Sequence, residues 1–401
     1  MNTSTIPVAV EALLCSRFRC TKSSCEQCLS VCPARAVTLA PGSAPSISQD
    51  CVGCGACVSA CPNGAIQTTG AREEDFDPVR ATDRQWAEHL EASAPGGVLR
   101  LACSRVDAEA DATFACLGRL TEPLLLALYR RKGREVRILK PDCGRCPWRA
   151  AGAAFDRVEH QTRAFLRLSG IAQERLQIVA ASRLEKPAQP PRAPVSRRAF
   201  IMDAVRQATG ILAESVMPGV PAAQSPLGSV GISREKTVER KDDPKRAHLL
   251  ETLAALSGRT GSAPPDYPAD SAPPAAGWVA AVEVAPECMG CNVCEALCPT
   301  GAIRRAQTER LFSLFFTPSK CTACDVCVQS CYPRALRLRR TGDPAALLGE
   351  EQKIFESRRG PCSACGAAFV SKDPGDVYCP ICLAQEGRRM ALARRWLKAE
   401  K

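Results

Sequence analysis

Histidine and aromatic residues are scarce in this sequence, and their scarcity excludes several kinds of protein. The 401 residues include three histidines, His89, His160 and His248, and aromatic side chains make up 5% of the chain. These histidines are scattered, and no acid, base and nucleophile form a catalytic motif. Phosphate-binding glycine fingerprints, nucleophile elbows and flavin motifs are also missing. We therefore expect no catalytic site of the chain's own, and several small domains instead of one large core.

Two further absences concern the cellular compartment. The first 18 residues lack the basic start, long apolar segment and small-residue cleavage site of a signal peptide. No run of 18 apolar residues occurs either. Both absences predict a cytoplasmic location, where reducing conditions keep thiols free. Cysteine, in contrast, is abundant, with 25 residues, and in this setting the thiols favour metal binding over disulfides.

Sixteen of the cysteines fall into four copies of one spacing pattern. Its clearest copy is Cys51, Cys54, Cys57 and Cys61, with a proline directly after Cys61. Three cysteines at intervals of three residues can wrap a [4Fe-4S] cube, and the fourth, next to proline, reaches the neighbouring cube in two-cluster ferredoxins. The other copies are Cys20, Cys25, Cys28 and Cys32; Cys288, Cys291, Cys294 and Cys298; and Cys321, Cys324, Cys327 and Cys331. The pattern therefore predicts four [4Fe-4S] clusters.

The copies form two adjacent pairs, and each pair resembles bacterial-type dicluster ferredoxins over about residues 10–70 and 280–340. The resemblance implies a compact, pseudo-symmetric α+β module at 1–70 and another at 278–341, with the fourth cysteine of each copy serving its partner copy. The implied ligand sets are Cys20, Cys25, Cys28 and Cys61; Cys51, Cys54, Cys57 and Cys32; Cys288, Cys291, Cys294 and Cys331; and Cys321, Cys324, Cys327 and Cys298. Two departures are the extra residues between Cys20 and Cys25, and Tyr332 inserted before Pro333.

Residues 95–182 have a different pattern, in which apolar segments alternate with a helical one. The segments 98–102, 112–115 and 135–139 are predicted strands, and 122–129 is a predicted helix with proline in its first turn. Strand, helix and strand in this order are typical of a parallel α/β unit. Four cysteines lie at or just beyond the strand ends, where such folds bind ligands; they are Cys103, Cys116, Cys143 and Cys146.

This middle segment resembles the delta subunit of methyl-viologen-reducing hydrogenases over about 60 residues. The similarity lies in ACLGRL at 115–120, in the helix that follows and in DCGRCPW at 142–148. It implies one [2Fe-2S] cluster on the four cysteines of this segment, and a role between a reductase and another electron-transfer subunit. A second cysteine expected near Cys103 is absent. The alternative is four buried structural thiols.

Residues 186–276 are rich in proline, alanine and serine without periodicity, which predicts a mostly disordered linker. Two segments within it have helical patterns, one from Ser196 to about residue 215 and one at 233–258. Each is either a docking element or an isolated helix of little consequence. A flexible linker of this length predicts that the two ferredoxin-like modules are placed separately and exchange electrons only when they touch.

The segment 350–401 carries a last group of cysteines, followed by a basic helix at 388–401. Two closely spaced cysteine pairs suit a closed tetrahedral site; the residues are Cys362, Cys365, Cys379 and Cys382. The group resembles zinc ribbons, which implies one zinc ion, and a rubredoxin-like iron is the alternative. Of the 25 cysteines, Cys15 remains unassigned, and we expect it to be a small apolar residue under the first cluster.

The formal net charge of +11 does not by itself predict a nucleic-acid partner. A site with four thiolates carries about −2, so six filled sites contribute about −12 and leave the loaded protein near neutral. The sequence thus predicts an α+β multidomain electron-transfer protein, a carrier or the wiring subunit of a larger oxidoreductase, with redox proteins as partners. The alternatives are a maturation or chaperone factor for a redox enzyme and a nucleic-acid-binding protein.

Overall fold

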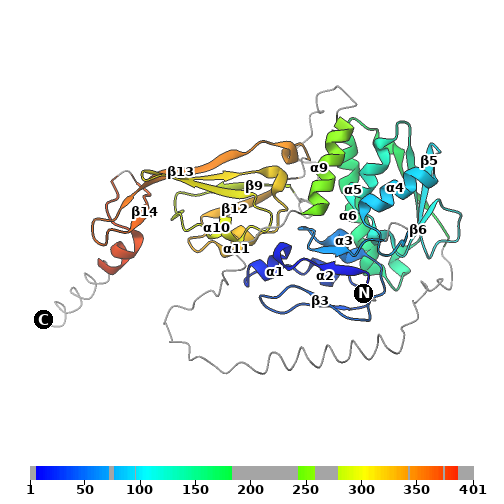
Figure 1. Cartoon of the computed structure of the whole chain (residues 1–401), viewed down its shortest axis with the longest axis horizontal. Helices are drawn as coiled ribbons and strands as arrows, with labels where there is room; N and C mark the ends of the chain where they lie inside the picture. The colour runs from blue at the N-terminus through cyan, green and yellow to red at the C-terminus, as the bar shows by residue number, and fades with distance from the viewer. Residues whose placement is uncertain are drawn as a thin grey trace.

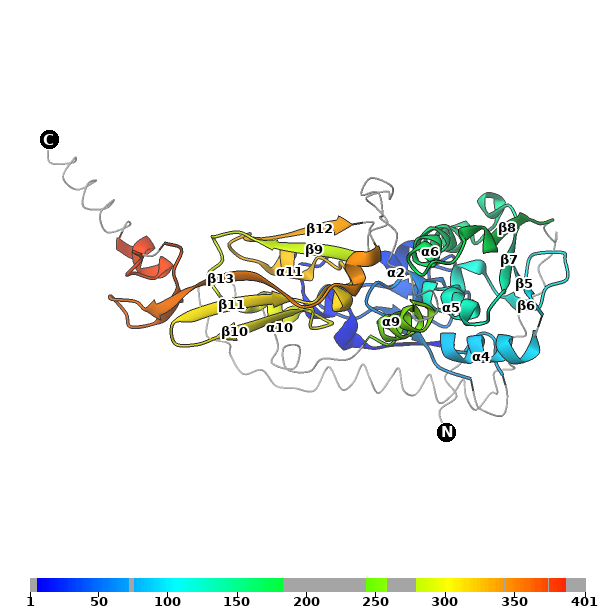
Figure 2. The same ribbon diagram turned by 90° about the horizontal axis from the view of Figure 1, so that it is seen from above.

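The computed structural model describes residues 6–71, 76–94, 96–182, 243–257, 279–341, 344–373 and 375–386. These residues form short helices and small sheets arranged along one long axis (Figure 1, Figure 2). A parallel sheet with its helices lies at one end, two cysteine-rich modules lie in the middle, and the C-terminal cysteine group lies at the other end. The predicted helix from Ser196, the basic helix at 388–401 and most of the predicted linker lie outside the described residues.

The first module, residues 6–71, consists of two antiparallel strand pairs with short helices between them. Strand β1 pairs with β4, and β2 pairs with β3. The elements are β1 (Val8–Val10), η1 (Ala12–Leu14), α1 (Ser16–Arg19), α2 (Gln27–Ser30), β2 (Val37–Thr38), β3 (Ser46–Ile47), α3 (Ala56–Ala60) and β4 (Ile66–Thr68). Its small apolar core joins Val8, Val37 and Ile66 to Cys28. Because so little apolar surface is buried, bound metal would supply much of the folding energy.

The second module, residues 279–341, repeats this plan with longer strands. The outer strands β9 and β12 pair antiparallel, and so do the inner strands β10 and β11. The elements are β9 (Val279–Val284), α10 (Val293–Leu297), β10 (Ile303–Gln307), β11 (Leu311–Phe316), η7 (Pro318–Lys320), α11 (Val326–Ser330) and β12 (Leu336–Thr341). Phe312, Leu314 and Phe316 alternate along β11 and fill the core. This is the period expected for a strand with one buried face.

The C-terminal segment continues the sheet of the second module. After η8 (Pro344–Leu348), β13 (Gln352–Pro361) pairs with β11 and with β14 (Ala368–Val370), which gives the order β10-β11-β13-β14. The region that the sequence suggested as a ribbon of its own from residue 350 is therefore anchored on the second module through a shared sheet.

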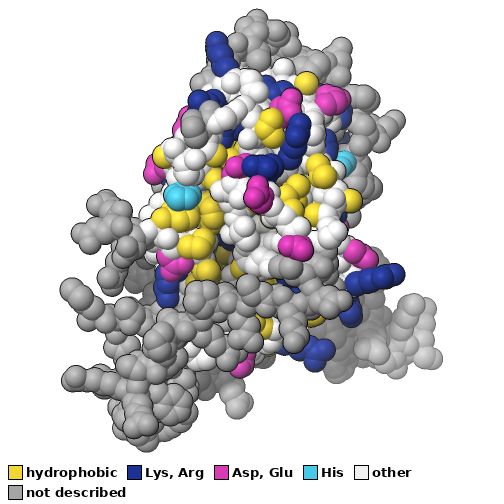
Figure 3. Space-filling view, turned by 90° about the vertical axis from the view of Figure 1, so that its right-hand side faces the viewer, with side chains coloured by type: hydrophobic (Ala, Val, Ile, Leu, Met, Phe, Trp, Pro, Cys, Tyr) yellow, Lys and Arg dark blue, Asp and Glu magenta, His cyan; other side chains and the backbone are white. Residues whose placement is uncertain are grey.

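The middle domain, residues 76–182, has a parallel sheet of order β6-β5-β7-β8, as its strand and helix pattern predicts. The elements are α4 (Asp83–Ser93), β5 (Val98–Cys103), β6 (Ala112–Phe114), η2 (Leu117–Arg119), α5 (Glu122–Ala127), η3 (Leu128–Arg130), β7 (Glu135–Lys140), η4 (Cys143–Arg145), α6 (Arg149–Leu168), η5 (Gln173–Arg175) and β8 (Leu176–Ala180). Helix α5 is buried along its whole length. Figure 3 views this end of the molecule, where hydrophobic side chains are interspersed with charged ones.

Helix α9 (Pro244–Ser257) lies inside the range predicted as linker, yet it belongs to the core of the middle domain. Leu249, Leu253 and Leu256 are buried in the same apolar cluster as the residues of α5. Thr252 accepts a hydrogen bond from the Arg130 side chain at 3.1 Å. Helix α9 therefore packs on α5 as an integral element of this domain (Figure 1).

The two modules touch each other directly, so the prediction that they are placed separately is wrong for this structure. Arg19, at the end of α1, is 2% exposed and donates to the carbonyl oxygens of Ala296 at 3.0 Å and Cys298 at 3.3 Å. Arg246 of α9 donates to the carbonyl oxygen of Ser319 at 2.8 Å. Buried hydrogen bonds from charged donors are expensive to break, and these bonds hold the first module and helix α9 against the second module.

Candidate iron-sulfur and metal sites

Three of the four cysteine loops share one backbone conformation. Gly55, Asn292 and Asp325 each follow the second cysteine of their copy and have φ of 71°, 62° and 61°. Glycine, asparagine and aspartate tolerate this left-handed conformation, which places the third cysteine in a short helix. A Cβ atom at Gly55 would also lie 2.3 Å from Cδ of Arg119. In the first copy the equivalent residue is Glu26, with φ of −130°, so that loop follows a different path.

The first module brings the fourth cysteine of each copy next to the other copy. Burial raises the pKa of Cys51 and Cys54, and the charge of nearby Cys32 raises both further. In the same way burial and the charge of Cys61 raise the pKa of Cys28 to about 12. Each pairing joins a cysteine of one copy to the proline-flanked cysteine of the other. These pairs of neighbouring cysteines are the ones expected if the fourth cysteine of each copy binds the cluster of the other copy.

The second module has the same arrangement. Burial is the main reason why the pKa values of Cys294 and Cys324 rise to about 12, and the charges of Cys331 and Cys298 respectively add to this. The charge of Cys331 also adds to the raised pKa of Cys288. Thiols with such pKa values stay protonated at neutral pH unless a bound cation compensates the charge. The donor sets of both modules therefore fit metal clusters.

The backbone after the fourth cysteine is alike in all four copies. The third residue beyond it has positive φ in each, at Arg35 (52°), Gly64 (62°), Gly301 (66°) and Arg334 (53°). In the fourth copy this residue is also the third after the cysteine, so the loop has the same length as in the other copies. Tyr332 therefore takes the place of the usual proline. Tyr332 is 84% exposed, so the substitution leaves the core unchanged.

Backbone amides also point at the sulfur atoms of these cysteines. The bonds run from Ala36 N to Cys32 Sγ at 3.3 Å, from Ala65 N to Cys61 Sγ at 3.2 Å and from Ala302 N to Cys298 Sγ at 3.2 Å. Such N–H donors stabilise thiolate charge and tune the reduction potential of a bound cluster.

The four cysteines of the middle domain meet at the carboxyl ends of its strands. Cys103 ends β5, Cys116 follows β6, and Cys143 begins η4 after β7. Burial raises the pKa of Cys116, and the charges of Cys103 and Cys143 raise it further. Burial also raises the pKa of Cys103, to which the charge of Cys146 adds. Four neighbouring thiols are a donor set that fits one cysteine-bound cluster.

Cys116 also lies against the first module. It shares an apolar cluster with Cys54 and Ala56, and the charge of Cys54 contributes to the raised pKa of Cys116. Close by, the hydroxyl of Ser59 donates to the carbonyl oxygen of Gly118 at 2.6 Å. The cysteines of the middle domain and those of the first module are therefore direct neighbours.

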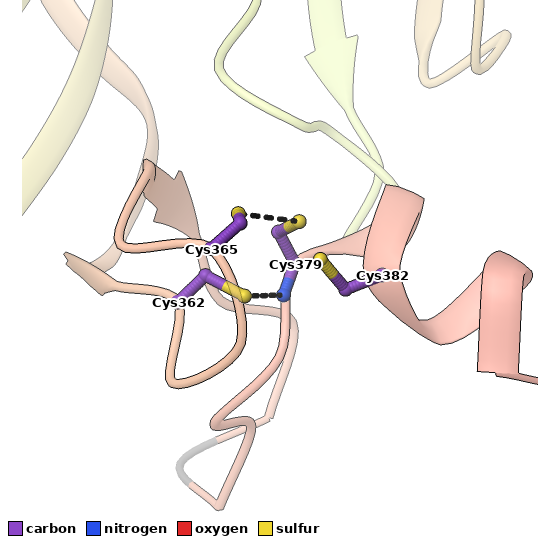
Figure 4. A group of neighbouring side chains, drawn as sticks. All are labelled: Cys362, Cys365, Cys379 and Cys382. Atoms are coloured by element: carbon purple, nitrogen blue, oxygen red, sulfur yellow. Dashed lines mark hydrogen bonds between the residues drawn. The ribbon is translucent and has the colours of Figure 1, made fainter.

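The C-terminal cysteine group is the most compact of these sets (Figure 4). The sulfur atoms of Cys362, Cys365, Cys379 and Cys382 all lie within 4.8 Å of one another. Cys365 and Cys379 are 3.9 Å apart, close to the ~3.8 Å expected between thiolates around one tetrahedral zinc ion. Backbone N–H donors, led by that of Cys379, lower the pKa of Cys362 to about 6. This set of thiols fits a single metal ion.

A buried asparagine, which the sequence analysis missed, links the two modules. The amide of Asn63 donates to the carbonyl oxygen of Leu14 and to the hydroxyl of Ser16, both at 2.8 Å, and accepts from Thr322 at 2.5 Å. Its one signal in the sequence is its position directly after Cys61 and a proline. The fold places it between the cysteines of both modules.

Comparison with known families supports the two modules. Residues 46–67 match the 4Fe-4S binding domain, and residues 287–335 match the 4Fe-4S dicluster domain. No curated protein matches the chain. The two domains point to an iron-sulfur protein that transfers electrons, and neither match extends into the middle domain. Among the described residues, no helix is long and apolar enough to cross a membrane.

Proposed function

We propose that this protein relays single electrons between two redox partner proteins, through five cysteine sets that follow one another along the molecule. The observation that carries the proposal is that each set has another set as its neighbour. Four [4Fe-4S] clusters in the two modules and one [2Fe-2S] cluster in the middle domain would supply the one-electron chemistry. The chain would hold these clusters in a row along the molecule.

The row of cysteine sets begins in the middle domain. Cys116 lies beside Cys54, so the middle set borders the set of Cys32, Cys51, Cys54 and Cys57. Within the first module, burial and then the charges of Cys54, Cys51 and Cys28 raise the pKa of the partly exposed Cys57. Because Cys28 belongs to the next set, these two sets are neighbours.

The order continues across the contact between modules. Asn63, two residues after Cys61, is hydrogen-bonded to Thr322, which follows Cys321. Within the second module, burial and the charges of its own set raise the pKa of the partly exposed Cys327, and the charge of Cys294 adds to this. The last set is therefore that of Cys288, Cys291, Cys294 and Cys331.

The two ends of this row are accessible to partners. Cys291 is exposed, and Cys143 and Cys146 are partly exposed. An electron donor docked at one end and an acceptor at the other would use the whole row, which favours a wiring subunit within a complex in a reducing compartment such as the cytoplasm. The C-terminal group, with one zinc ion, would fix the β13 and β14 hairpin as a structural site.

Anaerobic preparation of the full chain tests the proposal. We expect about 16 to 18 iron atoms and about one zinc ion per chain. On full reduction, neighbouring paramagnetic centres should broaden one another in the EPR spectrum. Cys116→Ser should remove about two iron atoms and simplify that spectrum. An iron count near eight, or a reduced protein whose centres do not interact, would contradict the proposed relay.

A further inference from the structure

We propose that Cys15, and not Cys20, completes the first cysteine site together with Cys25, Cys28 and Cys61. The inference rests on the proposed iron-sulfur function and reassigns one ligand within it. The spacing of the motif favours Cys20, because Cys20 is nearer to Cys25 along the chain. The structure distinguishes the two thiols by their backbone and by what they contact.

The N–H group of Cys15 makes the same backbone hydrogen bond as the first cysteine of each of the other three copies. In those copies, the N–H of Cys51 donates to Ser48 O at 3.2 Å, that of Cys288 to Ala285 O at 3.1 Å and that of Cys321 to Pro318 O at 3.0 Å. Cys15 donates in the same way to Ala12 O, three residues earlier, at 3.0 Å. Cys20 donates instead to Ser16 O, four residues earlier, and ends helix α1.

The backbone angles agree with this assignment. Cys15 ends the 3-10 turn η1 with φ of −75° and ψ of 125°, and Cys321 ends η7 with φ of −76° and ψ of 129°. Cys20 has φ of −137° and ψ of 114°. Because side-chain direction follows from the backbone conformation, Cys15 presents its thiol to its loop as Cys321 does.

Asn63 holds Cys15 beside the exchanged ligand of this site. It binds Leu14 and Ser16, the residues on either side of Cys15, and it lies two residues after Cys61. The chain on both sides of Cys15 is therefore hydrogen-bonded to the loop that carries Cys61, one of the ligands predicted for this site.

Cys20 has a different environment. It is 5% exposed and packs with Leu297 and Val326 of the second module, beside Val293 and the partly buried Cys324. A thiol among aliphatic side chains acts as a small apolar residue. The adjacent Arg19 donates to backbone carbonyls of the same module. The residues between Cys15 and Cys25 thus form a docking loop inserted into the cluster motif, which explains the unusual spacing.

The test compares alanine and serine variants of Cys15 with Cys20→Ala and Cys20→Val in the full chain, purified anaerobically. Iron, acid-labile sulfide and zinc per chain are measured, with EPR spectra of the reduced protein. We expect Cys15→Ala to lose about four iron atoms. Cys15→Ser should lose these atoms or shift the EPR signal of one centre. Both Cys20 variants should keep the wild-type iron content, and zinc, bound at the far end, is the internal control.

Two results would overturn the assignment: wild-type iron content in Cys15→Ala, or a loss of about four iron atoms in both Cys20 variants. Two Cys20 variants are used because either one alone can disturb packing, and iron retained in one of them shows that the thiol is not a ligand. Failure of the proposed function has a different result, since the unmodified chain would then itself hold about eight iron atoms or fewer.

Discussion

At the scale of single residues, a buried ion pair inside the middle domain holds the arginine that covers a cysteine loop of the first module. Arg119, 4% exposed, donates to Asp83 at 2.7 Å, and its aliphatic stem covers Gly55 in a cysteine loop. Burial would raise the pKa of Asp83, but the charge of Arg119 and the hydrogen bond from Thr121 outweigh this and hold it below its usual range. Asp83 is therefore ionised at neutral pH and stabilises the fold.

We predict that Asp83→Asn lowers the free energy of unfolding of the middle domain by about 3 kcal/mol at pH 7, because it leaves Arg119 buried without its counter-charge. The fluorescence of buried Trp86, also on α4, reports the transition. Since the folded pKa of Asp83 lies below the unfolded one, its stabilisation is complete above about pH 4 and is lost as the pH falls through the folded value. The difference between variant and wild type should shrink in that acidic range.

Glu251→Gln is the matched control, because Glu251 pairs with Arg84 at the surface. Exposed pairs contribute less than about 1 kcal/mol, so this variant should unfold like the wild type. Both variants keep every cysteine, and acid release of metal affects them equally. Equal losses in Glu251→Gln and Asp83→Asn would mean that the buried pair has no special role.

The cysteine loops were predictable from the sequence because their spacing is local, and so was the parallel order of the middle strands. Arg19, Asn63 and Arg246 were not, because their partners lie far away in the chain. Cys15 was set aside for the same reason: its hydrogen-bonded neighbours, and not its spacing, mark it as different from Cys20. Long-range contacts leave no periodic signal in a single sequence.

At the scale of elements, helix α9 shows why a helix can be predicted and its role missed. Leu249, Leu253 and Leu256 recur at helical spacing within a proline-rich region, and this favours a helix. Its partner α5 is buried along its whole length and is apolar after Glu122, and such a helix needs a cover on each face. The need of α5 for a covering helix, more than the sequence of α9 itself, explains why α9 packs there.

We predict that Leu253→Ala lowers the free energy of unfolding of the middle domain by about 3 kcal/mol, because the side chain is fully buried and leaves a cavity. Hydrogen exchange of the α5 amides should become faster in this variant. Ala255→Ser, at an exposed position of the same helix, is the control and should change neither quantity. If the Leu253→Ala protein were as stable as the wild type, with unchanged hydrogen exchange in α5, then α9 would be only a connecting segment.

At the scale of the whole molecule, the proposed relay depends on one contact, where the first module and α9 meet the second module. Arg246 contributes three bonds there, to the carbonyl oxygens of Ser319, Pro318 and Cys321. Burial lowers its pKa to about 10, so it stays charged at neutral pH. A charged donor that serves several carbonyl groups at once can hold α9 and the second module together.

We predict that Arg246→Ala weakens the docking of the second module by about 3 kcal/mol, which raises the undocked population on the order of 100-fold. Iron and zinc contents should remain those of the wild type, because Arg246 supplies no metal ligand. Amides around Thr322 and Leu297 should exchange faster, and magnetic interaction between the centres of the two modules should weaken. Arg304→Ala is the control, since Arg304 of β10 pairs at the surface with Glu351, just before β13. If Arg246→Ala kept both the slow exchange and the magnetic interaction of the wild type, the modules would be held by other contacts, and the row of sites would not depend on α9.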